Sequence, residues 1–238
     1  MKPYQKIAII ECGEPLVPIP LEHFAVESPH PYQKVGATYP EASPYHLRQS
    51  VLAALITAQA KLQNLHPGWR LQIFDAYRPV AVQQYMVDYT FAQVVQAEKH
   101  NPATLSDEQR EAIWQKVYKI WAVPSHNPQT PPPHSTGAAV DLTLIDATGQ
   151  VVDMGSAIDE LSPRSLADYY ANQPELPYHQ NRQLLRDVMS AAGFRRHLDE
   201  WWHFSLGDQM WAWLGNQEHP DATVTARYGC VATIAVLS

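Results

Sequence analysis

Apolar residues recur at the spacing of α-helices in four stretches of the chain, and most of these stretches have a recognisable boundary. Pro67 and the following glycine end the first run, and Pro79 is a residue type favoured at the first position of a helix. Ser106 begins a capping-box sequence, and Gly193 is suited to end the last run. The predicted helices span residues 46–64, 79–96, 106–121 and 179–192.

Two other stretches alternate apolar and polar positions, which is the pattern of a β-strand with two different faces. They cover residues 69–74 and 138–145. In the second stretch, Asp141 and Thr143 point away from the apolar face, which is formed by Val140, Leu142 and Leu144. The predicted strand therefore carries a carboxylate on the face opposite its core side chains.

Shorter elements are predicted between and after these. Thr148-Gly149 suits a hairpin turn with a return strand through residues 151–152, and residues 194–206 form a strand or a pair of short strands. Residues 124–133 are rich in proline, so this loop should be stiff and extended.

Helices mixed with short, hairpin-connected strands indicate an α+β fold in a single domain over residues 1–238, with a small, mostly antiparallel sheet packed with helices. Residues 1–43 contain many prolines and are expected to form an extended arm that wraps the surface, with at most short edge strands. Residues 208–238 form a C-terminal extension to which the pattern assigns no role.

Composition narrows the class of protein. The chain has 17 Lys and Arg against 24 Asp and Glu, a formal net charge of −7, which argues against binding to nucleic acid or to an anionic membrane surface. No Gly-rich nucleotide-binding motif is present in the sequence. What remains is a soluble globular domain, and the sequence predicts no particular oligomeric state.

The N-terminal residues lack the basic start and long apolar run of an export signal, which predicts a cytoplasmic protein. In that compartment Cys12 and Cys230 are expected to be reduced, buried thiols. A disulfide joining the two ends of the chain is the alternative.

Three short segments carry more polar chemistry than packing requires: residues 75–79, 134–141 and 200–203. Two imidazoles and one carboxylate are a common ligand set for catalytic Zn²⁺, with a fourth position left for water. His134, Asp141 and His203 offer this set. Glu200 is then placed to act as the general base toward that water.

Each of these residues also has an ordinary explanation. A single histidine is usually a hydrogen-bonded core or surface residue, and Arg78 by itself is an ion-paired side chain. Positions 200 and 203 lie on opposite sides of a flat strand, so the strand must bend or end near them for both to reach one metal. Because each residue has an ordinary explanation, a buried polar network without metal is the alternative to a zinc hydrolase.

The motifs together resemble those of the zinc-dependent D-alanyl-D-alanine dipeptidases, a family related more distantly to D-Ala-D-Ala carboxypeptidases and to the hedgehog signalling domain. The likeness runs from about residue 69 to 206. It is carried by H-x-x-G-x-A-x-D at residues 134–141, E-W-W-H at 200–203, D-A-Y-R-P at 75–79 and M-G-S-A-I-D at 154–159, where Ile158 replaces the usual phenylalanine.

The resemblance implies a zinc dipeptidase with one Zn²⁺ per chain, held by His134, Asp141 and His203. It also implies Glu200 as the catalytic base and Arg78 as the stabiliser of the oxyanion. On the substrate-binding side, Asp159 would accept the free amino group of a small dipeptide, and Asp75 is expected to orient the Arg78 guanidinium. Pro132 stands where the family usually has a serine, which puts one substrate contact in doubt.

Two other functions remain open at this point. One is a D,D- or L,D-carboxypeptidase that acts on peptidoglycan peptides, against which both Asp159 and the lack of an export signal argue. The other is a non-catalytic zinc-binding module, against which the presence of both Glu200 and Arg78 argues.

Overall fold

A five-stranded sheet lies at the centre of the computed structural model, which describes residues 2–39 and 44–231. Strand β2 pairs in parallel with β4, whereas β4–β5, β5–β7 and β7–β6 are all antiparallel. The sheet is thus mostly antiparallel, as predicted. Its strands, in spatial order, are β2 (Ala25–Val26), β4 (Arg70–Asp75), β5 (Ala139–Ile145), β7 (His203–Ser205) and β6 (Arg195–Arg196).

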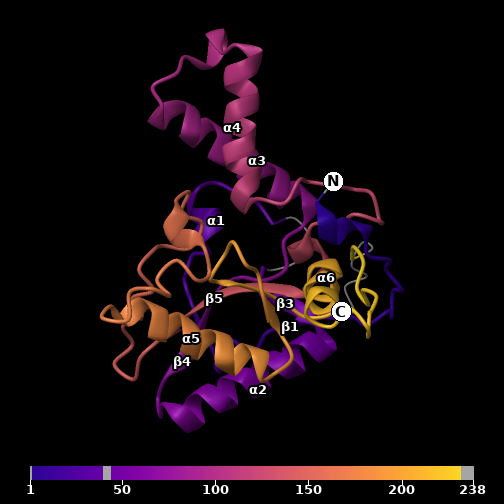
Figure 1. The fold of residues 1–238 in the computed structure, drawn as a ribbon, viewed down its shortest axis with the longest axis vertical. Helices are drawn as coiled ribbons and strands as arrows, with labels where there is room; N and C mark the ends of the chain where they lie inside the picture. Colours follow the sequence, from indigo (N-terminus) through magenta and orange to yellow (C-terminus); the bar gives the residue numbers. More distant parts are fainter. Residues whose placement is uncertain (1, 40–43, 232–238) are drawn as a thin grey trace.

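One face of this sheet is covered by α2 (Gln49–Leu65) and α5 (Pro177–Ser190), which lie together below it in Figure 1. The apolar side chains of β5 enter this core, and the alternation predicted for that strand is confirmed. Every residue of β5 is nevertheless buried, because the strand is central and its Asp141 face is covered as well. That second covered face holds the polar residues of interest.

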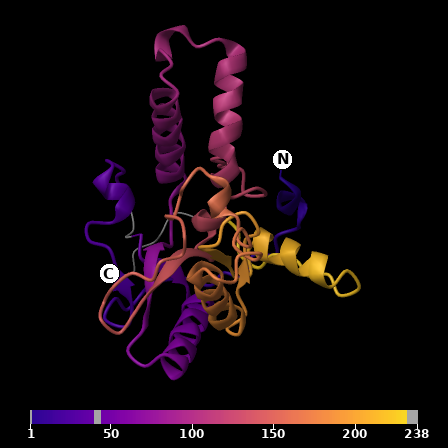
Figure 2. The same cartoon turned by 60° about the vertical axis from the view of Figure 1, so that its left-hand side comes forward.

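Helices α3 (Val80–Ala97) and α4 (Asp107–Ile120) form a hairpin that projects from the rest of the chain (Figures 1 and 2). The capping box predicted at its second helix is present, since Ser106 Oγ accepts from the Gln109 N–H at 3.2 Å and Gln109 Oε1 accepts from the Ser106 N–H at 2.9 Å. The hairpin packs around a second apolar cluster, which includes Trp121 and also Tyr32 and Ala37 of the N-terminal arm. The short 3₁₀ helix η2 (Pro102–Thr104) links the two helices.

The N-terminal arm contains more structure than predicted. It forms η1 (Pro3–Lys6), β1 (Leu16–Pro18), β2 and the short helix α1 (Pro31–Lys34), and it buries Tyr4 and Tyr32. Strand β1 pairs antiparallel with β3 (His46–Arg48), so the helix expected from residue 46 begins only at Gln49. Pairing with a distant strand overrides the local helical pattern at these three positions. Residues 1 and 40–43 of the predicted arm lie outside the described residues.

Two other predictions need correction or refinement. The return strand expected at residues 151–152 is reduced to a single bridge between Ile145 and Val151, because the chain leaves the sheet edge directly afterwards. Residues 194–206 form two short strands, β6 and β7, separated by a turn through residues 200–202. The predicted stiff loop ends in η3 (Pro133–Thr136), and η4 (Pro163–Ser165) follows the bridge.

Residues 10–12 and 226–227, from segments near the two ends of the chain, lie side by side. The N–H of Ile10 donates to the Ala226 carbonyl at 2.8 Å, and the N–H of Cys12 donates to the Arg227 carbonyl at 3.0 Å. The thiols of Cys12 and Cys230 are free, but the prediction that they are buried is wrong: Cys12 is exposed and Cys230 is half-buried. Both sit in these peripheral end segments rather than in the core.

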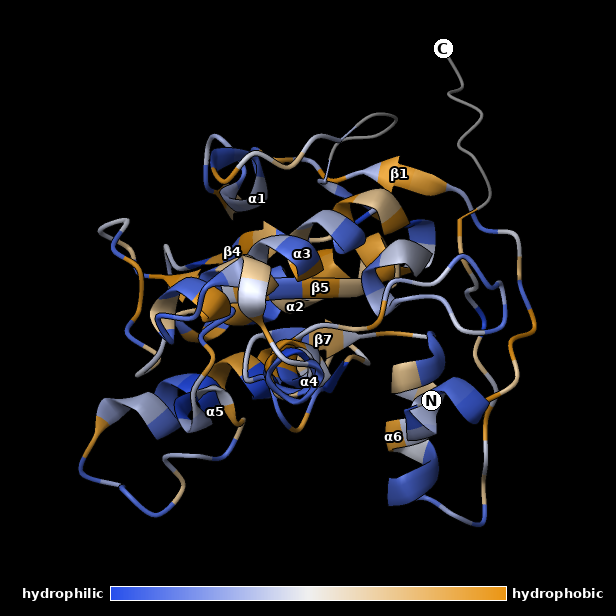
Figure 3. Cartoon of the chain, turned by 90° about the horizontal axis from the view of Figure 1, so that it is seen from above, coloured by the Kyte–Doolittle hydropathy of each residue, from blue (hydrophilic) through white to orange (hydrophobic). Residues whose placement is uncertain are grey.

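Helix α6 (Gln209–Glu218) lies in the predicted C-terminal extension and packs against η1, as seen in Figure 3. The part of the extension at residues 232–238 lies outside the described residues. Among residues 2–39 and 44–231, none of the helices is both long and apolar enough to cross a membrane.

Gly137 has a backbone conformation and a close neighbour that both favour glycine. Its φ is +70°, and a Cβ built there would come within 2.2 Å of the Leu16 side chain. We expect Gly137→Ala to lower the free energy of unfolding by at least about 1–3 kcal/mol, the usual cost of a left-handed non-glycine residue. Chemical denaturation measures this loss. Gly149 has a similar φ of +85° but open space around it, so Gly149→Ala measures the backbone cost without the steric clash.

Candidate metal centre and active site

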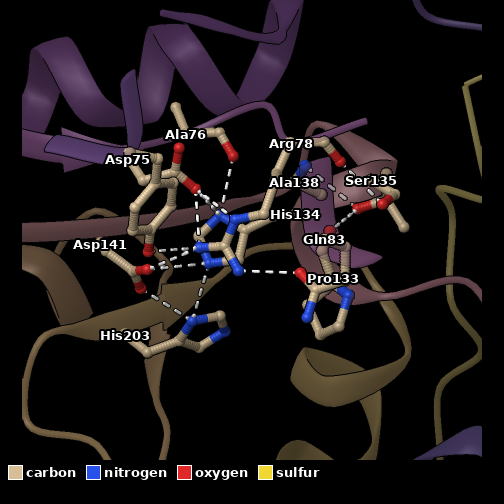
Figure 4. Close-up of polar contacts among 12 residues, drawn as sticks. Asp75, Ala76, Arg78, Gln83, Pro133, His134, Ser135, Ala138, Asp141 and His203 are labelled. Atoms are coloured by element: carbon tan, nitrogen blue, oxygen red, sulfur yellow. Dashed lines mark hydrogen bonds and ion pairs between the residues drawn. The ribbon is translucent and has the colours of Figure 1, made fainter. Parts of the chain in front are cut away.

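Neighbouring strands and one short helix bring the predicted metal ligands together. Asp141 in β5 pairs with His203 at the start of β7, and His134 approaches from η3 (Figure 4). One ligand atom from each of these three buried residues lies within 4.8 Å of the other two. Asp75, at the end of β4, is paired with Asp141 from the other side. The strand register therefore sets the site.

The spacing of these ligand atoms suits a divalent metal. His134 Nε2 lies 3.2 Å from His203 Nδ1 and 3.1 Å from Asp141 Oδ2, and His203 Nδ1 lies 3.0 Å from Asp141 Oδ1. In a tetrahedral zinc site with bonds of about 2.0–2.1 Å, ligand atoms are about 3.3 Å apart. Two imidazoles and a carboxylate at this spacing fit such an ion.

Outer contacts leave the correct imidazole nitrogens free for the metal. His134 Nδ1 lies 2.7 Å from the Ala76 carbonyl, so its N–H donates there and Nε2 is left unprotonated. Ser205 Oγ donates to Asp208 Oδ2 at 2.9 Å and lies 3.3 Å from His203 Nε2, whose N–H it accepts. Outer partners of this kind hold metal-binding histidines in orientation and tautomer.

Glu200 reaches the same site because the chain turns at residues 200–202, just before β7 begins. Its carboxylate lies 3.9 Å from His203 Nδ1. Burial raises the pKa of Glu200 well above its usual range, Asp141 adds to the rise, and Lys2 opposes it. A carboxylate whose pKa is raised in this way is a stronger base than an ordinary carboxylate, as a general base requires.

Arg78 is buried, and protein groups hold its guanidinium on several sides. Nε donates to Asp75 Oδ2 at 2.9 Å, and Nη1 donates to Gln83 Oε1 at 2.8 Å. Nη2 donates to the Tyr32 hydroxyl at 3.0 Å and lies 3.3 Å from Asp141 Oδ2. The plane also lies over the rings of Tyr32 and Trp121, with centroids 4.8 and 4.9 Å away.

Asp75 is completely buried and contacts Arg78 rather than the open part of the site. Burial works against ionisation of this carboxyl group, but Arg78 holds its pKa below the usual range. His30 Nε2 and the Tyr39 hydroxyl lie 3.2 and 3.1 Å from Oδ1. The geometry thus favours the orienting function that the sequence suggested for Asp75.

Asp159 lies on the far side of Tyr32 from Arg78. The Tyr32 hydroxyl donates to Asp159 Oδ2 at 2.9 Å while it accepts from Arg78. Burial, followed by the charge of Asp141, raises the pKa of Asp159 to about 7. Its backbone φ is +62°, an uncommon conformation for a residue other than glycine, so the fold holds this carboxylate in place at some cost.

One small cavity contains most of these groups, and sequence reasoning missed several of its walls. The predicted residues that line it are Arg78, His134, Asp141, Asp159, Glu200 and His203. Lys2, Tyr4, Gln83, Trp121 and His197 also line it. Burial, followed by the charge of His203 and then that of Lys2, lowers the pKa of His197 to about 3, so this imidazole is neutral. No spacing pattern in the arm pointed to Lys2, Tyr4 or Tyr32.

An α+β fold with a buried His-Asp-His site, a nearby carboxyl group and a buried arginine defines a hydrolase of the metallopeptidase type. The sequence model of the D-Ala-D-Ala dipeptidase family, peptidase M15, matches residues 25–225. The chain therefore belongs to the M15 peptidase family of D-Ala-D-Ala dipeptidases.

The chain is similar to individual members of this family and, more distantly, to a solved structure. A D-alanyl-D-alanine dipeptidase of Synechocystis is 53% identical over 240 residues, which cover 97% of this chain and 97% of that protein. One of Enterococcus faecium is 30% identical over 166 residues, covering 69% and 73% of the two chains. A solved structure of the D,D-pentapeptidase VanY in complex with Zn(II) aligns over 82% of this chain and 89% of its own, with 13% identity and a TM-score of 0.47.

Proposed function

We propose that this chain hydrolyses D-alanyl-D-alanine to free alanine, with one Zn²⁺ held by His134, Asp141 and His203. The observation that carries the proposal is the convergence of these three ligand atoms, at 3.0–3.2 Å from one another, in a cavity that Glu200, Arg78 and Asp159 also line. The relatives named D-alanyl-D-alanine dipeptidase support the choice of substrate. A cytoplasmic location stays a prediction.

The residues of the chain divide the work of the reaction. Bound zinc supplies a Lewis acid, which polarises a carbonyl group and lowers the pKa of water. Glu200 accepts a proton from the attacking water and passes it to the leaving amine. Arg78 presents a fixed cation to the oxygen on which negative charge develops. Asp159 binds the ammonium group of the dipeptide.

The specificity of Asp159 follows from charge. In a dipeptide the amino group next to the scissile residue is a free ammonium, which pairs with the carboxylate. In a longer peptide the same position is an uncharged amide, which leaves the carboxylate without a cation. This requirement for a free amine distinguishes a dipeptidase from the carboxypeptidases considered above.

Hydrolysis by the zinc-loaded chain tests the proposal. We expect turnover of D-Ala-D-Ala, and little turnover of L-Ala-L-Ala or of N-acetyl-D-Ala-D-Ala. Comparable cleavage of the acetylated peptide would instead indicate a carboxypeptidase, and no cleavage of any peptide would indicate a non-catalytic metal-binding module. Preparation without metal is the control, with zinc content measured in the same samples.

Asp159→Asn is expected to raise KM for D-Ala-D-Ala by about 10–100-fold, the effect of losing a hydrogen bond to a charged group. In the unsubstituted chain, Asp159 takes up a proton as the pH falls through about 7, so KM should rise below that pH. The asparagine variant should lack this rise. A KM that depends on pH equally in both proteins would argue against the role, and the exposed Asp221→Asn serves as the matched control.

A further inference from the structure

We propose that Lys2 binds the C-terminal carboxylate of the dipeptide, which makes it a specificity-determining residue for substrates with a free C-terminus. This inference rests on the proposed dipeptidase function. Asp159 is assigned to the amino end of the substrate, and Lys2 is proposed to bind its carboxyl end. The proposal also gives a function to η1 and α6, which lie outside the sequence motifs.

The cavity offers only a few positive charges for this carboxylate. Among the described residues that line it, Lys2 and Arg78 are the lysine and arginine side chains. Arg78 is already held by Asp75, Gln83 and Tyr32 and is directed at the metal ligands. The half-buried Lys2 carries the cation that these contacts leave available.

Lys2 is held in this wall by its local structure. Its backbone N–H donates to Gln5 Oε1 at 2.9 Å at the start of η1, and the next turn buries Tyr4 against Met210 and Leu214 of α6. Gln209 Nε2, also from α6, donates to the Ile7 carbonyl at 2.7 Å. Helix α6 thus fixes η1 against the cavity, which lowers the entropy lost when Lys2 orders around a ligand.

The position of Lys2 matches the polarity of the proposed substrate. Asp159 accepts a hydrogen bond from Tyr32, and Lys2 lines the same cavity as Asp159, Glu200 and His197. The charge of Lys2 acts on both Glu200 and His197. A dipeptide with its ammonium at Asp159 and its scissile bond at the metal directs its carboxylate toward Glu200.

The chemistry of the leaving group requires the same direction. Glu200 gives its proton to the amine of the C-terminal residue, and the carboxylate is only one carbon beyond that nitrogen. A cation that lines the same cavity as Glu200 and acts on its charge is therefore suited to bind this carboxylate. In this arrangement two groups of opposite charge in one cavity, Asp159 and Lys2, recognise the two ends of the dipeptide.

Comparing D-Ala-D-Ala with its C-terminal amide tests the role of Lys2. We expect the unsubstituted chain to prefer the free acid, and Lys2→Met to raise KM for the acid by about 10–100-fold, since one hydrogen bond to a charged group is lost. KM for the amide should hardly change, so the preference for the acid should collapse. Lys2→Arg should keep most of that preference.

Lys6→Met is the matched control, because it makes the same change at an exposed position at the end of η1, the helix that Lys2 precedes. An acid-to-amide preference in Lys2→Met equal to that of the active unsubstituted chain would overturn the inference and leave the dipeptidase function intact. Failure of the zinc-loaded, unsubstituted chain to cleave either peptide would overturn both. A general loss of activity on acid and amide alike would also count against Lys2, since it would indicate a structural effect.

Discussion

His203→Ala is expected to leave the purified protein with almost no zinc and without measurable dipeptidase activity. His203 supplies one of three converging ligand atoms, and its Nδ1 lies 3.0 Å from Asp141 Oδ1. Loss of a residue that merely supports a ligand commonly costs about 10–100-fold in metal affinity, so loss of a ligand should cost more. Metal content by mass spectrometry and the rate of D-Ala-D-Ala hydrolysis measure the two effects.

A readout independent of activity strengthens this test. Zinc that binds only the folded state raises the melting temperature of the unsubstituted chain. Zinc should not change the melting temperature of His203→Ala. His126→Ala, a change at an exposed loop histidine, should be stabilised by zinc like the unsubstituted chain. Stoichiometric zinc in His203→Ala would show that the metal is held elsewhere.

Glu200→Ala is expected to separate metal binding from catalysis. The variant should keep its zinc, because Glu200 is not one of the three converging groups, yet turnover should fall by about 10²-fold or more. Single-turnover rates at saturating D-Ala-D-Ala, together with zinc content, measure this. The neighbouring Asp199→Ala removes an exposed carboxylate and should have little effect. Near-normal turnover in Glu200→Ala would contradict its role as the base.

Local signals predicted the elements whose determinants lie close together in the chain. The start of α4 depends on Ser106 and Gln109, which bond to each other within one helical turn. The alternation along β5 places Asp141 on the face opposite the core, and this pattern can be read from neighbouring residues alone. The prediction of a helix from residue 46 is wrong for its first three residues, because a distant segment determines their structure. These residues form β3, and β3 pairs with β1, which lies about thirty positions earlier.

In the candidate site, too, some residues could be predicted from local motifs and others could not. The three ligand residues and Glu200 could be predicted from short sequence motifs. The sequence did not determine how the side chains of Glu200 and His203 reach the same metal site. The structure answers this with a turn immediately before β7. Tyr32 was not predicted at all, although it joins Arg78 to Asp159, because its contact with Asp159 spans 127 positions and leaves no periodic pattern.

The sequence by itself determined the class of fold, most helix boundaries to within a few residues, and the set of side chains able to hold a metal. These depend on periodicity, capping and residue chemistry, which act over a few positions. Only the tertiary structure decided which groups enclose those side chains: the register of β4, β5 and β7, the bridge through Tyr32, and the docking of η1 on α6. Such contacts join distant segments through shape and burial, so no local pattern records them.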